Sequence, residues 1–158
     1  MSILTNPYGN TFTIVRFEGG ATTDILALEG TFDCFVLSKS PGLSAPEIQA
    51  LARTLATGGG QWIEVFGCYA ERIHDAIDEC AVAIGRQPSA GRGNPMTTWN
   101  DEPDDDDEIG SYIWTGGQGS SDRKVVLVIG DKDAEERVRT SLLKRGHPGP
   151  GGHLDSSP

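Results

Sequence analysis

The chain has 158 residues, of which 37% are hydrophobic and 23% are charged. This length and composition fit a single folded domain with one core and exclude wholesale disorder. The formal net charge is −10 at pH 7, and the 13 basic residues are scattered along the chain. Phosphate backbones and anionic membrane surfaces repel such a chain, so direct binding to nucleic acid or to a membrane is disfavoured.

The cysteines and the N-terminal segment favour a cytoplasmic protein. Cys34, Cys68 and Cys80 are odd in number and form no C-x-x-C motif, so we expect free thiols in a reducing compartment. Residues 1–10 lack the basic and apolar segments of a signal peptide. No apolar run approaches the roughly 20 residues that a membrane span requires.

The first part of the chain combines strand patterns with one clear helix. Residues 11–17 and 32–38 are rich in β-branched and aromatic residues and predict strands, the second of them buried on both faces. Residues 25–30 ("ILALEG") predict a short strand between them. Ser44 and Glu47 form a capping box ahead of an apolar stripe that ends at three glycines, so a helix is expected there.

The middle of the chain continues with a strand and a helix, and a long loop follows them. Residues 61–67 predict a buried strand, and residues 69–85 predict a helix with one apolar and one acidic face. Residues 86–109 are rich in Pro, Gly, Asn and acidic residues, which predicts a long acidic loop.

The C-terminal part returns to strands and helices. Residues 110–117 ("GSYIWTGG") predict a short strand, and residues 123–131 predict a fully buried one. A helix should follow from Asp131, with acids at its start and Lys144 near its end. Residues 146–158 predict a disordered C-terminal tail.

Strands that alternate with helices predict an α/β fold. We expect a three-layer sandwich with about six strands and about three helices. Its central sheet should be mostly parallel, with an antiparallel N-terminal edge. Residues 1–145 should form this single domain, including the long acidic loop at 86–109.

One strand-to-helix turn is a candidate phosphate site. Gly130 follows a buried strand and Asp131 precedes a helix, an arrangement that can bind anions. A Rossmann fingerprint requires three spaced glycines and a Walker motif requires G-x-x-x-x-G-K-[ST], and the sequence has neither. The acids at the start of this helix would also repel a phosphate, so a capped helix is the preferred interpretation.

Cys68 is the candidate nucleophile. It lies between a predicted strand and a predicted helix, where the helix dipole can lower the pKa of a thiol. The motif of thiol-dependent phosphatases, C-x-x-x-x-x-R, is not matched, because His74 stands in place of the arginine. A catalytic pair of Cys68 with His74 as its base is the alternative to a structural thiol.

No metal site and no cofactor are predicted. The three histidines do not combine with the cysteines at the spacings of zinc sites. The consecutive acids at 101–108 do not fit a calcium-binding loop, which requires acids at alternate positions and a glycine at the sixth.

The acidic run is the most unusual feature of the sequence. Seven of the eight residues at 101–108 are Asp or Glu, and Trp99 and Trp114 flank them as expected anchors that are at least partly buried. A solvated loop is one interpretation of the run, and a docking surface for a basic protein is the other. The predicted partner-binding residues are Trp99, Asp101, Glu102, Asp104, Asp105, Asp106, Asp107 and Glu108.

Two segments resemble a known family. The stretch "WIEVFGCYAERIHDAIDE" followed by "MTTWNDE" is similar to a family of small bacterial proteins of unknown function, over residues 30–135. The resemblance implies a bacterial or phage-like origin and transfers no catalytic residue.

Two functions remain open from the sequence. The first is a non-enzymatic protein-binding module of regulatory, inhibitor or immunity type, in which the acidic loop and the exposed face of the second helix contact a basic partner. The second is a small enzyme or nucleotide-binding domain with its site at the strand ends near Cys68 and Gly130. The oligomeric state does not follow from these patterns.

Overall fold

The computed structural model describes residues 1–5, 11–17, 30–40, 42–85, 95–100, 105–114, 119 and 121–144. The described strands form one six-stranded sheet in the order β1-β2-β6-β3-β4-β5. They are β1 (Ser2–Thr5), β2 (Thr11–Phe17), β3 (Phe32–Ser38), β4 (Gly60–Gly67), β5 (Met96–Asn100) and β6 (Lys124–Ile129). The described helices are α2 (Ala45–Gly58), α3 (Ala70–Ala83), α4 (Asp106–Trp114) and α5 (Lys132–Leu143).

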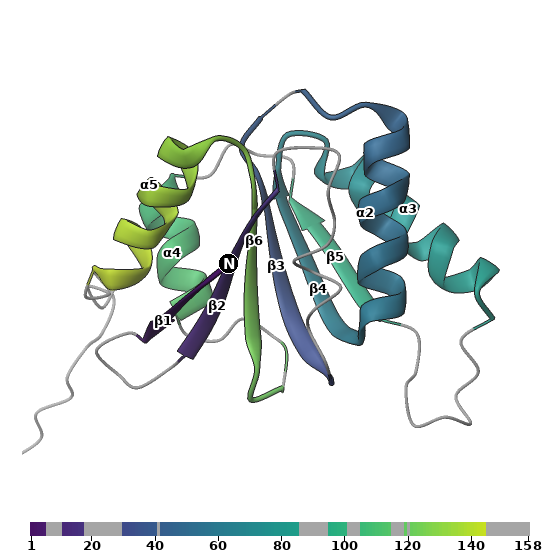
Figure 1. Cartoon of the computed structure of the whole chain (residues 1–158), viewed down its shortest axis with the longest axis horizontal. Coiled ribbons are helices and arrows are strands. Elements are labelled where there is room, and N and C mark those ends of the chain that lie inside the picture. Colours follow the sequence, from purple (N-terminus) through teal and green to yellow (C-terminus); the bar gives the residue numbers. More distant parts are fainter. Residues whose placement is uncertain are drawn as a thin grey trace, which may run out of the picture.

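The helices cover both faces of the sheet, which gives three layers (Figure 1). On one face, α2 and α3 pack against a buried cluster that includes Val36 and Val65 from the sheet. On the other face, α4 and α5 pack against a second cluster that includes Phe35 and Val126. Alternate residues of β3 therefore enter the two cores, as the continuous apolar pattern of this strand predicted.

The predicted fold class is confirmed. The β1–β2 pair is antiparallel and every other strand pair is parallel. The capping box of α2 is also present, since the Ser44 backbone N–H donates to Glu47 Oε2 at 2.8 Å. The described helices number four, one more than the sequence predicted, and the additional one is α4.

The predicted loop at 86–109 contains two elements that the sequence interpretation missed. Strand β5 adds to the edge of β4 in parallel register, and α4 begins inside the acidic run. The short strand predicted at 110–117 is wrong for residues 110–114, which are helical. Ile109 and Ile113 are both buried and stand four residues apart, so a helix places both in the core.

Some predicted segments cannot be compared. Residues 25–29, most of 86–95 and the predicted tail at 146–158 lie outside the described residues. Strand β1, which the sequence interpretation did not identify, supplies the antiparallel N-terminal edge.

The connections define a switch point in the sheet. Neighbouring strands β3 and β6 run parallel, but α2 follows β3 on one face while α5 follows β6 on the other (Figure 1). The segments that follow β3 and β6 therefore leave the carboxyl ends of these strands toward opposite faces of the sheet. In open α/β sheets such a divergence leaves a crevice at the strand ends, where ligands bind.

Candidate functional site

The second half of the acidic run begins a helix. Asp105 precedes α4, and its carbonyl oxygen accepts the backbone N–H groups of Glu108 at 3.0 Å and Ile109 at 3.1 Å. Asp105 Oδ1 also accepts the Asp107 backbone N–H at 3.1 Å. Carboxylates at a helix N-terminus complement the positive end of the helix dipole. The predicted loop at 86–109 is therefore corrected at its end, where the acids belong to a helical turn.

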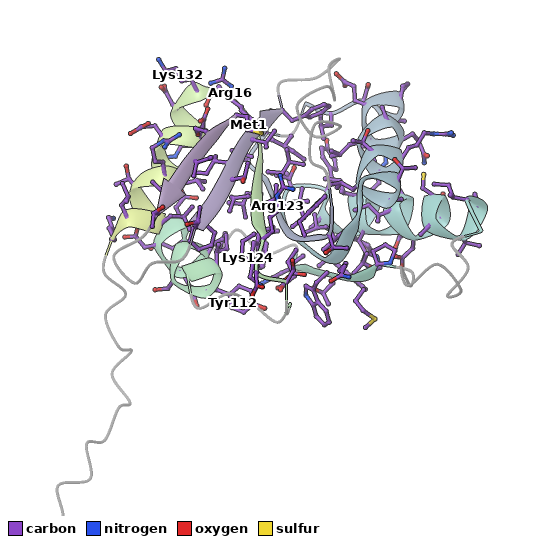
Figure 2. All side chains as sticks on the ribbon, turned by 60° about the horizontal axis from the view of Figure 1, so that its bottom comes forward. Met1, Arg16, Tyr112, Arg123, Lys124 and Lys132 are labelled. Carbon is purple, nitrogen blue, oxygen red and sulfur yellow. The ribbon has the colours of Figure 1, made fainter. Side chains whose placement is uncertain are left out.

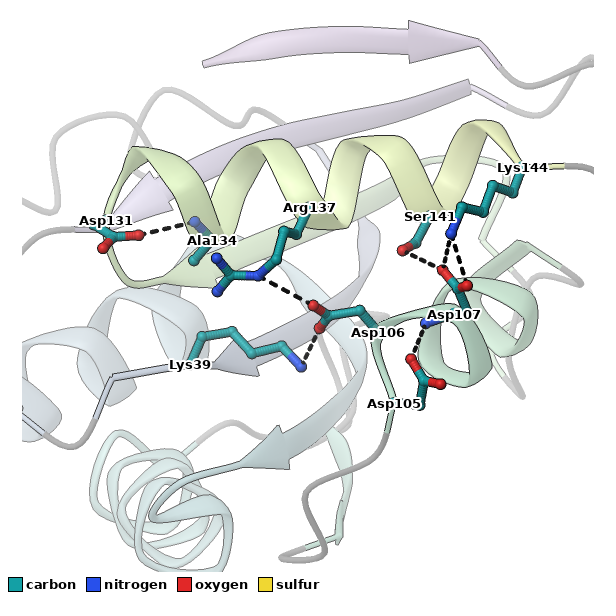
Figure 3. Close-up of polar contacts among 9 residues, drawn as sticks. All are labelled: Lys39, Asp105, Asp106, Asp107, Asp131, Ala134, Arg137, Ser141 and Lys144. Carbon is teal, nitrogen blue, oxygen red and sulfur yellow. Dashed lines mark hydrogen bonds and ion pairs between the residues drawn. The ribbon is translucent and has the colours of Figure 1, made fainter.

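Asp106 joins three elements of the fold. Its Oδ1 lies 2.7 Å from Lys39 Nζ, just beyond β3. Its Oδ2 lies 3.3 Å from Arg137 Nε on α5. Figure 3 shows Asp106 between the two cations. Its side chain is only 25% exposed, so this acid holds α4 in place instead of projecting into solvent.

Asp107 forms a second set of contacts between α4 and the end of α5. Lys144 Nζ donates to Asp107 Oδ2 at 2.7 Å and to Oδ1 at 2.8 Å. Ser141 Oγ donates to Oδ1 at 3.0 Å (Figure 3). The hydrogen bond from Lys144, with a smaller contribution from Ser141, holds the pKa of Asp107 below its ordinary value. Asp107 and Lys144 both stay about half exposed.

A glycine permits the close approach of α4 to α5. A Cβ atom on Gly110 would lie 2.8 Å from Ser141 Cβ and 3.1 Å from the Ser141 carbonyl carbon. Ile109 and Ile113 then reach the core shared with Val138 and Leu142. The acidic start of α4 is thereby placed beside the α5 helix.

A groove of about 470 Å³ opens between the start of α4 and the α5 helix. Its lining includes five carboxylates and two cations. Among the described residues, Asp133 has no cationic partner, and neither does the exposed Glu108 just outside the groove. The lining residues are Asp105, Asp106, Asp107, Asp133, Glu136, Arg137, Thr140, Ser141 and Lys144. Lys39 and Arg139, which lie outside the lining, pair with Asp106 and Glu136. Among the described residues, Asp105 and Asp133 are thus the lining carboxylates that can still accept a cation.

The described members of the predicted partner-binding set lie on two faces of the sheet. Asp105, Asp106 and Asp107 line the groove, whereas Asp101, Glu102 and Asp104 lie outside the described residues. Trp99 lies with α3 on the opposite face of the sheet, where its ring centroid is 4.3 Å from that of His74. It is 48% exposed, which agrees with the expected partial burial, and the side chain of Trp114 lies outside the described residues.

Cys68 and His74 occupy different environments. Cys68 is exposed and follows β4, whereas His74 is 9% exposed. The imidazole Nδ1 lies 3.0 Å from Asp75 Oδ1, and Nε2 lies 3.6 Å from Asp78 Oδ2. Asp78 Oδ1 also accepts a hydrogen bond from the Thr97 hydroxyl, with an O–O distance of 2.7 Å. Within the described part of the chain, both imidazole nitrogens face carboxylates of α3, and the Cys68–His74 pair stays a prediction.

The two remaining thiols are placed as core residues, as expected. Cys34 and Cys80 are buried. Burial, with a smaller contribution from neighbouring Asp33, raises the pKa of the Cys34 thiol far above its ordinary value. Cys34 therefore stays protonated and unreactive at neutral pH.

A buried polar cluster was missed by the sequence interpretation. Asp33 is 1% exposed and accepts Lys124 Nζ at 2.6 Å and the Ser121 backbone N–H at 2.8 Å. Lys124 stands at the start of β6 (Figure 2) and also donates to the Gly119 carbonyl oxygen at 2.8 Å. A Cβ on Gly119 would lie 2.3 Å from the Asp33 carboxylate. The signal was an acid inside an apolar strand, which requires a buried partner.

A second buried carboxylate lies on the same face of the sheet. Glu64 is 3% exposed, and Tyr112 of α4 donates its hydroxyl to Glu64 Oε2 at 2.6 Å. Tyr112 also packs edge-on against Phe66, with ring centroids 5.9 Å apart. This contact ties α4 to β4 as well as to α5.

Within the described residues, no group of three or more His, Cys, Asp or Glu side chains has a geometry that could hold a metal ion. None of the described helices combines the length and the apolar character needed to cross a membrane. Comparison with protein-family models and with the curated proteins finds no match.

Proposed function

We propose that the chain is a non-enzymatic protein-binding module whose α4–α5 groove receives basic side chains of a partner protein. The observation that carries the proposal is the groove of about 470 Å³, in which five carboxylates outnumber two cations. A regulatory, an inhibitor and an immunity role all fit such a module. The expected setting is the bacterial cytoplasm.

The groove acids differ in how firmly they are already engaged. Asp106 is three-quarters buried between Lys39 and Arg137, so it serves the fold. Asp107 is half exposed, and its pair with Lys144 is half exposed too. Exposed ion pairs contribute little to stability. A lysine or arginine of a partner can therefore replace Lys144 at this carboxylate without unfolding α4.

Charge outside the groove assists the same encounter. The net charge of −10 attracts a basic surface from a distance and raises its association rate. Glu108 at the start of α4 and Asp133 at the start of α5 are both exposed. The acids at 101–104 precede this surface directly in the sequence. Because Glu108 and Asp133 are exposed, salt should weaken binding strongly.

The test is affinity capture from a bacterial lysate at low salt. The groove variant carries Asp105→Asn, Asp133→Asn and Glu136→Gln, which remove three charges and leave the buried contacts of Asp106 intact. The control carries Asp122→Asn, which removes an exposed acid outside both the groove lining and the α3 helix.

We expect the wild-type chain and the control to capture the same basic protein, and the groove variant to lose it. Adding salt should release the captured protein, because screening shortens the range of the attraction. Equal capture by the groove variant and the wild-type chain would overturn the proposal.

A further inference from the structure

A second cavity lies at the switch point of the sheet. It encloses about 250 Å³ and is lined by residues at the ends of β2 and β6, after β3 and in the first turn of α2. They are Phe17, Ser40, Gly42, Leu43, Glu47, Ile129, Gly130 and Asp131. Cavities at such divergence points are the usual ligand sites of open α/β sheets. This pocket is separate from the groove, with which it shares no lining residue.

The pocket combines apolar walls with two carboxylates. Phe17 and Ile129 are buried core residues, and Leu43 packs against the same core. Glu47 and Asp131 supply the charged groups, and Ser40 supplies a hydroxyl. Lys39, which follows β3 and precedes Ser40, is paired with Asp106 on α4. The described lining therefore carries negative charge without a compensating cation.

The two helix N-termini at this pocket already have their own carboxylate partners. Glu47 Oε2 accepts the backbone N–H of Ser44 at 2.8 Å, and Asp131 Oδ1 accepts the backbone N–H of Ala134 at 2.8 Å. A phosphate group would have to displace these carboxylates or lie against their negative charge, so a nucleotide is disfavoured. Within the described residues, Glu47 Oε1 and Asp131 Oδ2 have no donor and can accept one from a ligand.

We propose that the switch-point pocket binds a small molecule with an apolar body and a protonated amine. The apolar body would pack between Phe17, Leu43 and Ile129, and the ammonium group would face Glu47 and Asp131. A volume of about 250 Å³ is below the roughly 300–1,000 Å³ of sites for drug-sized ligands, so the ligand is metabolite-sized. Cys68 is not among the lining residues, and the proposal requires no thiol chemistry.

The test uses three small probes with the ¹⁵N-labelled full chain. Phenethylamine has the aromatic body and the ammonium group, phenylpropionate has a similar body with a carboxylate, and methylamine has the ammonium group alone. We expect phenethylamine to cause saturable shifts of the backbone amides of Gly42, Leu43 and Gly130. Phenylpropionate should cause none, and methylamine should bind at least ~tenfold more weakly because it lacks the apolar contacts.

Substitutions in the lining test whether phenethylamine binds in the switch-point pocket. The double variant Glu47→Gln/Asp131→Asn keeps both helix caps, since Gln and Asn can still accept the capping hydrogen bonds. It should weaken phenethylamine binding by ~tenfold or more, because it removes two charge-assisted contacts. Ser40→Leu, which narrows the pocket, should weaken it as well. The control Asp122→Asn removes an exposed charge outside both the pocket and the groove and should leave the affinity unchanged.

Three results would overturn the proposal: no saturable binding of phenethylamine, equal binding of phenylpropionate, or undiminished binding by the double variant. None of them bears on partner capture by the groove, since the groove variant keeps the whole lining of this pocket.

Discussion

Two lysine–carboxylate pairs of nearly equal length lie in contrasting regions of the molecule. Lys124 Nζ is 2.6 Å from Asp33 Oδ2, with side chains 13% and 1% exposed. Lys144 Nζ is 2.7 Å from Asp107 Oδ2, with side chains 56% and 51% exposed. The first pair joins the central strands β3 and β6 inside the protein. The second joins α4 to the end of α5 at the edge of the groove.

The comparison shows that distance alone does not indicate what an ion pair does. Removing one partner of a buried pair leaves a charge that water cannot reach, so the fold depends on both groups. Removing one partner of an exposed pair leaves a charge that water solvates at once. The buried pair is therefore structural, and the exposed pair is free to exchange partners, which is the property that a docking site requires.

The largest effect should come from Lys124→Met. The substitution leaves Asp33 buried with one hydrogen-bond donor, the Ser121 backbone N–H. We expect a loss of about 3–5 kcal/mol in the free energy of unfolding, measured by urea denaturation. The double variant Lys124→Met/Asp33→Leu should recover much of this loss, because no uncompensated charge remains. A loss below about 1 kcal/mol in the single variant would show that water reaches Asp33.

An intermediate effect should come from Asp106→Asn. Asp106 is partly buried and contacts Lys39 and Arg137, so its environment lies between those of the two pairs. We expect a loss of about 1.5–3 kcal/mol in unfolding free energy, the usual contribution of hydrogen bonds to charged groups. The control Glu108→Gln, at an exposed position of the same helix, should change stability by less than about 0.5 kcal/mol. Equal effects of the two substitutions would mean that Asp106 is solvated.

The layers of the fold were predictable from local patterns. The apolar run at 32–38 and the capping box at Ser44 each depend on residues that are close in sequence, and both are confirmed. Edge strand β5 was missed because an edge strand needs only a few β-forming residues, here "MTTWN". Its burial pattern has no fully buried position, so the chain shows no apolar run there.

The candidate site was less predictable, because its geometry depends on residues that are far apart in sequence. The carboxylates of the acidic run repel one another, so the sequence suggested a solvated loop. In the structure Asp106 meets Lys39 and Arg137, and Asp107 meets Lys144. Scattered cations in a sequence do not reveal that three of them converge on one helical turn. The groove follows from that convergence and from the small size of Gly110, which lets α4 approach α5.

The smallest effect should be the pH dependence that Asp107 adds to stability. The hydrogen bonds from Lys144 and Ser141 lower the pKa of Asp107 in the folded chain. A carboxyl whose folded-state pKa is depressed stabilises the fold above its unfolded pKa of about 3.9, and this contribution is lost as the pH falls through the folded pKa. The variant Asp107→Asn should therefore flatten the acid limb of the stability curve and leave the slope near neutral pH unchanged. Urea denaturation of both chains between pH 2 and pH 6 measures this difference, with Glu108→Gln as the neighbouring control. An acid limb identical in Asp107→Asn and the wild-type chain would mean that the Lys144 contact has no energetic weight in solution. Asp107 would then be as available to a partner's cation as any solvated acid, and the two ion pairs would differ even more than their exposure indicates.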